Sequence, residues 1–177
     1  MSADAIKFRT QDKRYGLSLD DAIMTKMLTL CKETANVETG GILVGYYTNN
    51  HEWAIVSDVS GPPIGSKRAF SSFVRGIKGL QQWLNDMWDS TNRHYYLGEW
   101  HYHPFATPAA SYVDVKQIKE HAENGPLNCP EPIMLIVGGN PNNLFDMRAY
   151  IYPKGERLYE MEKLGYILNS RGKKASY

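Results

Sequence analysis

Residues 95–114 read YYLGEWHYHPFATPAASYVD, and this stretch decides the fold because it predicts a strand, a loop and the start of a helix. β-Favouring residues fill its first part, and Pro104 cannot continue a hydrogen-bonded ladder. His101 and His103 stand two positions apart near the end of this strand, so both imidazoles point to one side of the sheet. One metal ion could therefore bind both.

A helix is predicted to begin after Ser111, because Val115, Ile118 and Ala122 recur at helical spacing. Asp114 falls in its first turn, where the helix N-terminus favours an ionised carboxylate. The preceding residues, rich in proline and alanine, predict a loop that returns toward the end of the strand. Two histidines, one carboxylate and an open fourth position are typical of catalytic zinc, which lowers the pKa of bound water to about 7.

Each of these patterns also has an ordinary structural interpretation. A His-x-His pair occurs in strands without any metal, and a serine three residues before an acid is commonly only a capping box. Their combination within one strand, loop and helix start favours a functional site.

Hydrolysis would also need a general base, and Glu38 is the candidate. It precedes the run 39–47, whose glycines and apolar residues predict a buried strand. Taken alone, such a glutamate would be a solvated charge at a strand end. Glu99 is the rival base, because a regular strand would place it on the face of His101 and His103. It lies about 7 Å along the strand and could equally hold one imidazole tautomer.

These residues together resemble a known motif. Glu38 before a glycine-rich strand, then His101-x-His103, seven residues and Ser111-x-x-Asp114, is similar to the JAMM motif of the JAB/MPN-domain metalloproteases. The spacing from the second histidine to the serine and the aspartate fits that motif without a gap.

The resemblance extends from about residue 15 to about residue 155 as an order of elements. The segments GEWH at 98–101 and ETGG at 38–41 look most like small bacterial members, including the JAB deconjugase of cyclic-oligonucleotide anti-phage (CBASS) operons. The family commonly has Ser or Thr between the histidines, whereas this chain has Tyr102. A regular strand directs Tyr102 away from the metal, so we expect it to alter packing and not chemistry.

The resemblance implies a zinc-dependent isopeptidase or peptidase. His101, His103 and Asp114 would hold one catalytic Zn²⁺, and a water would complete the tetrahedron. Glu38 would take a proton from that water and pass it to the leaving amine, while zinc polarises the scissile carbonyl. Ser111 would donate a hydrogen bond to the tetrahedral oxyanion, a type of contact worth roughly 3 kcal/mol in other enzymes.

The resemblance also implies the partners. The substrate would be a ubiquitin-like protein, or another protein conjugated through its C-terminus, whose tail binds as an added strand. In the anti-phage members this protein is a cyclic-oligonucleotide synthase, and an activating or conjugating enzyme from the same operon is a further expected partner. Two alternatives stay open: a peptidase that processes a ubiquitin-like or sulfur-carrier precursor, and a non-catalytic MPN binding scaffold. Such scaffolds usually lack metal ligands, whereas this chain has every expected type.

Length and composition, at 177 residues with 42% hydrophobic and 22% charged, predict one globular domain over residues 1–177, with a polar, mobile tail from about 168. The resemblance implies that this one domain is a JAB/MPN domain. A net charge of +1 creates no field that would attract nucleic acid. The sequence shows neither a signal peptide nor an apolar run long enough for a membrane, so we expect a cytoplasmic protein. In that compartment Cys31 and Cys129 would be free thiols.

The whole pattern predicts an α+β fold, and the resemblance specifies an MPN/JAB-like domain with a central mixed β-sheet flanked by helices, as in cytidine deaminases. The loop 61–66 is expected to be a connector or, by resemblance, a flap over the substrate tail. Four helices are expected. The first begins at a Ser18–Asp21 capping pair, the second covers 72–90, the third begins after Ser111, and the fourth includes Leu158, Met161 and Leu164. The further expected strands cover 41–47, 53–59, 133–137 and 147–152.

Overall fold

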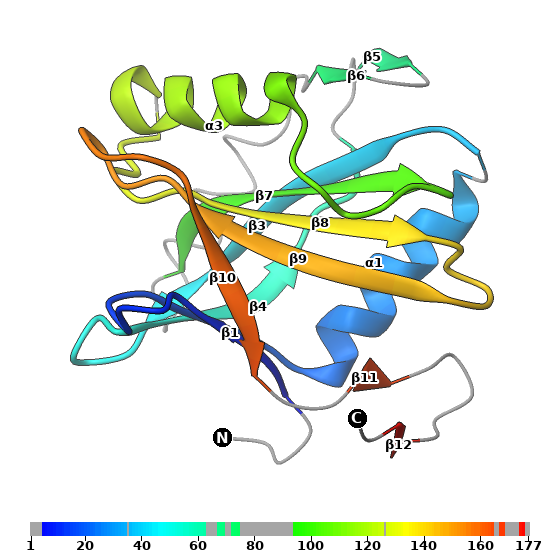
Figure 1. The fold of residues 1–177 in the computed structure, drawn as a ribbon, viewed down its shortest axis with the longest axis horizontal. Coiled ribbons are helices and arrows are strands. Elements are labelled where there is room, and N and C mark those ends of the chain that lie inside the picture. Colours follow the sequence, from blue (N-terminus) through cyan, green and yellow to red (C-terminus); the bar gives the residue numbers. More distant parts are fainter. Residues whose placement is uncertain are drawn as a thin grey trace.

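The computed structural model describes residues 5–34, 36–62, 67–69, 72–74, 94–125, 127–164, 167–168 and 174–175. Eight strands form a closed barrel (Figure 1). Around the barrel they follow the order β1 (Ile6–Arg9), β10 (Tyr159–Leu164), β9 (Phe145–Ile151), β8 (Ile133–Gly139), β7 (Tyr95–Pro104), β3 (Thr39–Tyr47), β4 (Trp53–Val59) and β2 (Gly16–Leu19).

The barrel is a mixed sheet, as predicted. β7 pairs with β8 and β2 pairs with β4 in parallel, and the other neighbouring strands are antiparallel. The sheet closes on itself, however, so it is not simply a central sheet between layers of helices. The strands expected at 41–47, 53–59, 133–137 and 147–152 are confirmed, with ends shifted by up to two residues.

Helix α1 (Asp21–Glu33) has its N-cap two positions after Ser18, the N-cap of the predicted capping pair. Asp20 is its N-cap, and the Asp20 carboxylate accepts a hydrogen bond from the Ile23 N–H at 2.9 Å. Ser18 lies in β2 opposite Lys7, so the expected Ser18–Asp21 capping pair is wrong. The apolar residues that recur at helical spacing in this segment form its inner face: Ile23, Met24, Met27 and Cys31 are buried, and Leu28 is partly buried against the same core.

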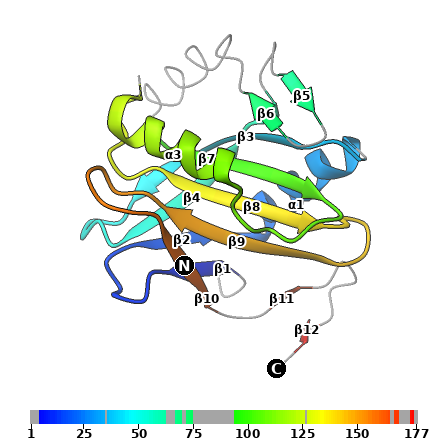
Figure 2. The same ribbon diagram turned by 45° about the horizontal axis from the view of Figure 1, so that its top comes forward.

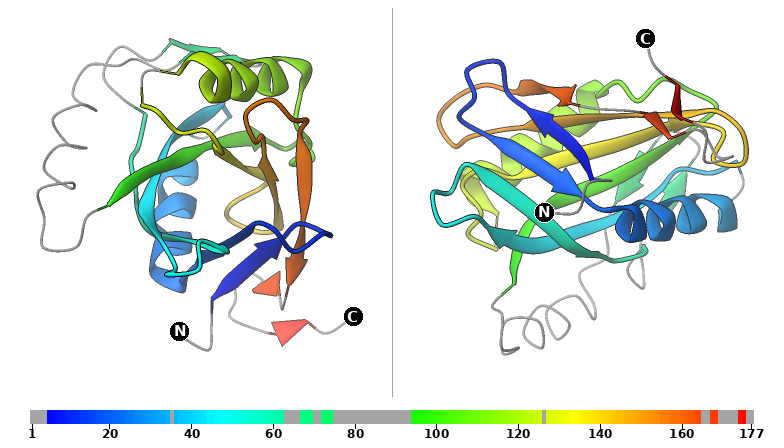
Figure 3. Two further views of the ribbon diagram at one scale, coloured as in Figure 1. Left: turned by 90° about the vertical axis from the view of Figure 1, so that its left-hand side faces the viewer. Right: turned by 90° about the horizontal axis from the view of Figure 1, so that it is seen from below.

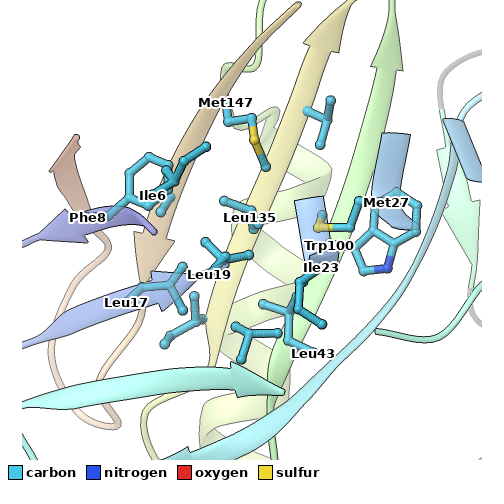
Figure 4. Packing of buried hydrophobic residues seen from close by; sticks show 14 of the residues in the cluster. Ile6, Phe8, Leu17, Leu19, Ile23, Met27, Leu43, Trp100, Leu135 and Met147 are labelled. Carbon is cyan, nitrogen blue, oxygen red and sulfur yellow. The ribbon is translucent and has the colours of Figure 1, made fainter. Parts of the chain in front are cut away.

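The barrel interior is one hydrophobic cluster to which α1 and every barrel strand contribute. Because side chains alternate along a strand, the strands send every second residue inward, except where the register of β4 and β7 shifts. Figure 4 shows ten of these inward side chains directed toward one another: Ile6, Phe8, Leu17, Leu19, Ile23, Met27, Leu43, Trp100, Leu135 and Met147.

Helix α3 (Tyr112–Asn124) packs on the outer surface of the barrel, so the two helices lie on opposite sides of β8 (Figure 3). Its buried residues Ile118 and Ala122 contact outward side chains of β8 and β9, among them Met134 and Tyr150. The start of this helix is confirmed at Ser111.

The helix expected around residues 158–164 is wrong, because this segment is strand β10. Met161 is buried between the exposed residues Glu160 and Glu162, which is the alternation of a strand. The segment forms a strand because it has two strand partners: β10 pairs first with β9, through Met161 and Ala149, and then with β1.

Two short ladders lie outside the barrel, β5 (Lys67–Ala69) with β6 (Ser72–Val74), and β11 (Ile167–Leu168) with β12 (Lys174–Ala175). β6 occupies the start of the helix predicted over 72–90, because it pairs with β5 across a short connection. That part of the prediction is wrong, and residues 75–90 lie outside the described residues. The possible flap residues 63–66 and most of the predicted tail also lie outside them. Within the described part of the chain, no helix is sufficiently long and apolar to cross a membrane.

Candidate metal centre

The register of β3 and β7 places the predicted base beside the predicted ligands. Gly40 of β3 pairs with His101, and Thr39 pairs with Tyr102. Glu38 directly precedes Thr39, so it lies at the end of the ladder where His103 stands. A Cβ atom at Gly40 would lie 2.3 Å from the Trp100 carbonyl oxygen, and this close approach of the two strands requires glycine.

The capping box of α3 orients the third predicted ligand. The Ser111 hydroxyl accepts a hydrogen bond from the Asp114 N–H at 3.2 Å, and the Asp114 carboxylate accepts one from the Ser111 N–H at 2.7 Å. These reciprocal bonds hold the Asp114 side chain over the start of the helix. In Figure 2, α3 crosses in front of β7 and β8, and its first turn follows the loop that leaves β7.

Three donor groups meet in the resulting cluster. His101 Nδ1 lies 2.9 Å from Asp114 Oδ1, and His103 Nε2 lies 3.7 Å from Asp114 Oδ2. The donor atoms of the three residues all lie within 4.8 Å of one another. Zinc–ligand bonds of 2.0–2.2 Å in a tetrahedron separate ligand atoms by about 3.4 Å, and the two observed distances bracket that value. The donor set therefore fits a tetrahedral ion.

Burial and close polar contacts shift the pKa values of the cluster in opposite directions. Burial lowers the pKa of His101, but the hydrogen bond to Asp114 and the close Glu99 carboxylate outweigh burial and raise this pKa to about 9. Burial would raise the pKa of Asp114, yet contacts with His101 and Ser111 lower it to about 2. Burial is also the main cause of the lowered pKa of His103, which favours the neutral imidazole that a metal needs.

Glu38 belongs to the same electrostatic environment. Its pKa is raised, first by burial and then by the negative charge of Asp114, while His101 acts in the opposite direction. Ser111 lies at the exposed rim, and its hydroxyl oxygen accepts from the Asp114 N–H. The Ser111 hydroxyl hydrogen stays available for donation to a ligand.

The other two residues considered from the sequence lie on opposite faces of β7. Tyr102 is fully buried in the barrel interior, where its hydroxyl donates to the Gly139 carbonyl at 3.1 Å, so its predicted direction is confirmed. Glu99 shares the face of His101, but it contacts α3 through Gln117 and His121.

Sequence reasoning missed these two partners of Glu99. The available signal was the helical spacing of Asp114, Gln117 and His121, which puts all three on one face of the helix predicted after Ser111.

The fold and the site together define a class: a mixed β-barrel domain whose His-x-His and Ser-x-x-Asp segments bring together three residues that could hold a metal ion. The sequence pattern of a family described as prokaryotic homologs of the JAB domain matches residues 20–150. Because this match covers most of the chain, the protein belongs to the prokaryotic JAB family.

Three relatives are similar to this chain over different lengths. A CD-NTase/cGAS isopeptidase of Enterobacter hormaechei subsp. hoffmannii (strain UCI 50) is 31% identical over 156 residues, which are 88% of this chain and 86% of the relative. A protein of the same name from Escherichia coli (strain TW11681) is 34% identical over 107 residues, 58% of this chain and 63% of the relative. Probable metalloprotease y4qB of Sinorhizobium fredii (strain NBRC 101917 / NGR234) is 24% identical over 136 residues, 71% of this chain and 77% of the relative.

A solved structure supports the fold. The solution structure of protein DSY2949 from Desulfitobacterium hafniense superposes with a TM-score of 0.59 at 19% sequence identity, and covers 81% of this chain and 88% of that chain. At this identity the likeness concerns the fold alone.

Proposed function

We propose that this protein is a zinc-dependent isopeptidase that hydrolyses the amide bond after the C-terminal tail of a conjugated protein. The observation that carries the proposal is the convergence of His101, His103 and Asp114 in one buried cluster, with Glu38 at its edge. The relatives named isopeptidase support the reaction class, and the relative named metalloprotease supports the metal.

The donor set favours zinc, because two imidazoles and one carboxylate are common ligands of catalytic zinc and leave a fourth position open. A zinc ion bound there would lower the pKa of a water molecule to about 7 and polarise a carbonyl group. His101 must be neutral to act as a ligand, so metal binding to the protonated imidazole releases a proton.

Glu38 is proposed as the group that moves the proton. The water oxygen forms a bond to the scissile carbonyl carbon, and Glu38 accepts the proton that the water loses. When the C–N bond breaks, Glu38 delivers this proton to the amine nitrogen, so the products are a carboxylic acid and a free amine. The raised pKa of Glu38 supports this role, because a base works best when its pKa approaches the working pH.

Ser111 is proposed to stabilise the oxygen that becomes negative during the attack. Its hydroxyl is held in place by the Asp114 N–H and keeps its hydrogen for donation. A donor that is already oriented stabilises the transition state without reorganisation.

We infer that the conjugated protein is a CD-NTase, the cyclic-oligonucleotide synthase expected from the sequence. Two relatives carry this substrate class in their names. An enzyme that resembles ubiquitin activators would make the conjugate, and the conjugated tail would bind as an extended strand.

A cleavage assay tests this function. The zinc-loaded protein is incubated separately with three substrates. They are an isopeptide conjugate of a CD-NTase, a linear fusion in which a second protein follows the tail of a ubiquitin-like protein, and a sulfur-carrier precursor. We expect cleavage of the conjugate directly after the tail, no cleavage by His101→Ala, and kcat/KM lowered by about 10²–10⁴ in Glu38→Gln.

Each of the other outcomes would contradict one part of the proposed function. Absence of cleavage of every substrate would overturn the enzymatic role and favour a binding scaffold. Cleavage of only the linear precursors would identify a processing peptidase. Full activity of Glu38→Gln together with loss in Glu99→Gln would make Glu99 the base.

A further inference from the structure

A second group of polar side chains lies on the side of His101 that faces away from Asp114. His101 Nδ1 faces Asp114, whereas His101 Nε2 lies 3.5 Å from Glu99 Oε2, which is an ion-pair distance and longer than the roughly 2.7–3.2 Å of a direct N–H···O hydrogen bond. Glu99 is only 7% exposed. A carboxylate buried this deeply must be compensated by hydrogen bonds or opposite charge.

Three side chains besides His101 supply that compensation. The Gln117 amide donates to Glu99 Oε2 at 3.2 Å, and the Tyr96 hydroxyl donates to Glu99 Oε1 at 3.4 Å. His121 Nδ1 lies 3.5 Å from the same Oε1. Both carboxylate oxygens therefore have partners, and one of them also faces the imidazole of a proposed ligand.

A β-bulge in β7 builds one half of this cluster. The pairing of β7 with β3 shifts by one residue between Gly98 and Tyr96, and Gly98 has φ +146°. In a regular strand Leu97 would share the face of Glu99; the bulge instead puts Leu97 in the barrel interior and Tyr96 beside Glu99. A Cβ atom at Gly98 would lie 1.8 Å from the Ile133 carbonyl oxygen, so only glycine fits there.

One face of α3 builds the other half. Asp114, Gln117 and His121 follow one another at intervals of three and four residues, which places them in a row along the helix. The proposed ligand and two partners of Glu99 thus come from the same row, and all three face β7.

The space inside this cluster is too small for a substrate. Polar side chains of the cluster line a cavity of only about 10 Å³, together with Ile118, Pro132, Ile133 and Met134. That is room for about one water molecule. The cluster therefore has no room for a substrate of its own, whereas its Glu99 carboxylate directly contacts the proposed ligand His101.

We infer that Glu99 is a positioning residue of the metal centre: it accepts a hydrogen bond from the Nε2–H of His101 and thereby keeps His101 Nδ1 unprotonated and directed at the ion. Gln117, Tyr96 and His121 hold the Glu99 carboxylate for this task. The inference rests on the proposed function, because it requires the centre to bind zinc. Loss of a carboxylate that orients a ligating histidine typically lowers metal affinity 10–100-fold.

Zinc affinity, measured by competition with a chromophoric chelator, tests the inference. Glu99→Gln keeps the shape of the side chain but removes its charge, and we expect zinc affinity to fall about 10–100-fold. The matched control is Glu120→Gln, because Glu120 is an exposed residue of the same helix whose carboxylate accepts a hydrogen bond from Asn124 and is not part of the Glu99 cluster. The control should bind zinc as the unsubstituted protein does.

A second variant separates positioning from stability. Gln117→Met removes the amide donor at similar volume and should weaken zinc binding by a smaller factor than Glu99→Gln. In the double variant the two losses should not multiply, because Gln117 acts through Glu99. ¹⁵N NMR of the zinc-bound protein should show a proton on Nε2 of His101, and this signal should shift in Glu99→Gln.

The outcomes that overturn the inference differ from those that overturn the proposed function. A folded Glu99→Gln variant with unchanged zinc affinity would overturn the positioning role alone. If that variant does not fold, unchanged zinc affinity of Gln117→Met would do the same. Failure of the unsubstituted protein to bind zinc would overturn the proposed function and the inference with it.

Discussion

Ser111 contributes to both helix stability and the proposed chemistry, and these contributions can be separated. Ser111→Ala removes an N-cap, which costs about 1 kcal/mol of unfolding free energy, and it also removes the proposed oxyanion donor. Asp20→Ala removes the N-cap of α1, which lies away from the site. We expect both variants to lose similar stability in urea unfolding, whereas only Ser111→Ala loses roughly 10²–10³-fold in kcat. Equal kcat values of the two variants would contradict the proposed role of Ser111 as the oxyanion donor.

The cluster of His101, His103 and Asp114 was predictable at the residue level because strand alternation and a helix cap are local rules. The environment of Glu99 could not be predicted by such local rules. A regular strand would put Leu97 on the face of Glu99, and only the bulge at Gly98 brings Tyr96 there instead. The contact that requires this glycine comes from Ile133, a residue distant in sequence, so no local pattern reveals it.

Among the elements, two distant turns are joined by exposed ion pairs. Arg14 follows β1 and lies 2.6 Å from Asp12 and 2.9 Å from Glu156, in the turn before β10. The Thr10 hydroxyl and then Arg14 lower the pKa of Asp12 to about 2, and Arg14 and then the Tyr159 hydroxyl lower the pKa of Glu156 to about 2. These contacts tie the β1–β2 hairpin to the β9–β10 hairpin.

The lowered pKa values predict an acid-dependent loss of stability. A carboxylate whose folded pKa lies below its unfolded value of about 4 stabilises the folded state above pH 4, and this stabilisation disappears as the pH falls toward 2. In Arg14→Gln the difference in unfolding free energy between pH 7 and pH 2 should be smaller. Urea titrations at several pH values measure it, and about 1 M salt should reduce the contrast between the two proteins. An identical pH dependence would contradict this role of Arg14.

The β10 error shows why element type can depend on partners. Leu158, Met161 and Leu164 fit a helical spacing, but Tyr159 and Met161 fit an alternating one equally well. Pairing with β9 and β1 favours the strand over the helix, because β10 satisfies the backbone hydrogen-bonding groups that both strands would otherwise leave unpaired.

For the whole molecule, the two cysteines report on two separate hydrophobic clusters, Cys31 on the barrel interior and Cys129 on the smaller cluster with Ile42, Val44 and Tyr96. Cys31 and Cys129 are both buried free thiols, as predicted, and burial raises the pKa of each to about 12. We expect no reaction with a thiol-specific reagent in the native protein and two equivalents in denaturant. Rapid reaction of the native protein would contradict the burial of these side chains.

Closure of the barrel was beyond sequence reasoning. The strand patterns predicted an α+β fold and the family resemblance implied a mixed sheet, but closure depends on β1 pairing with β10, where Lys7 stands opposite Leu164. Pairing between opposite ends of the chain leaves no local signal, and the short β1–β2 hairpin was not expected at all.

The central claim is that His101, His103 and Asp114 form one zinc site, and metal content tests it most directly. Protein prepared with zinc and freed of excess metal is analysed by mass spectrometry, beside Asp114→Asn prepared in the same way. We predict about one zinc per chain in the unsubstituted protein and far less in folded Asp114→Asn. A folded, unsubstituted protein without zinc, or an Asp114→Asn variant that keeps a full equivalent, would contradict the account.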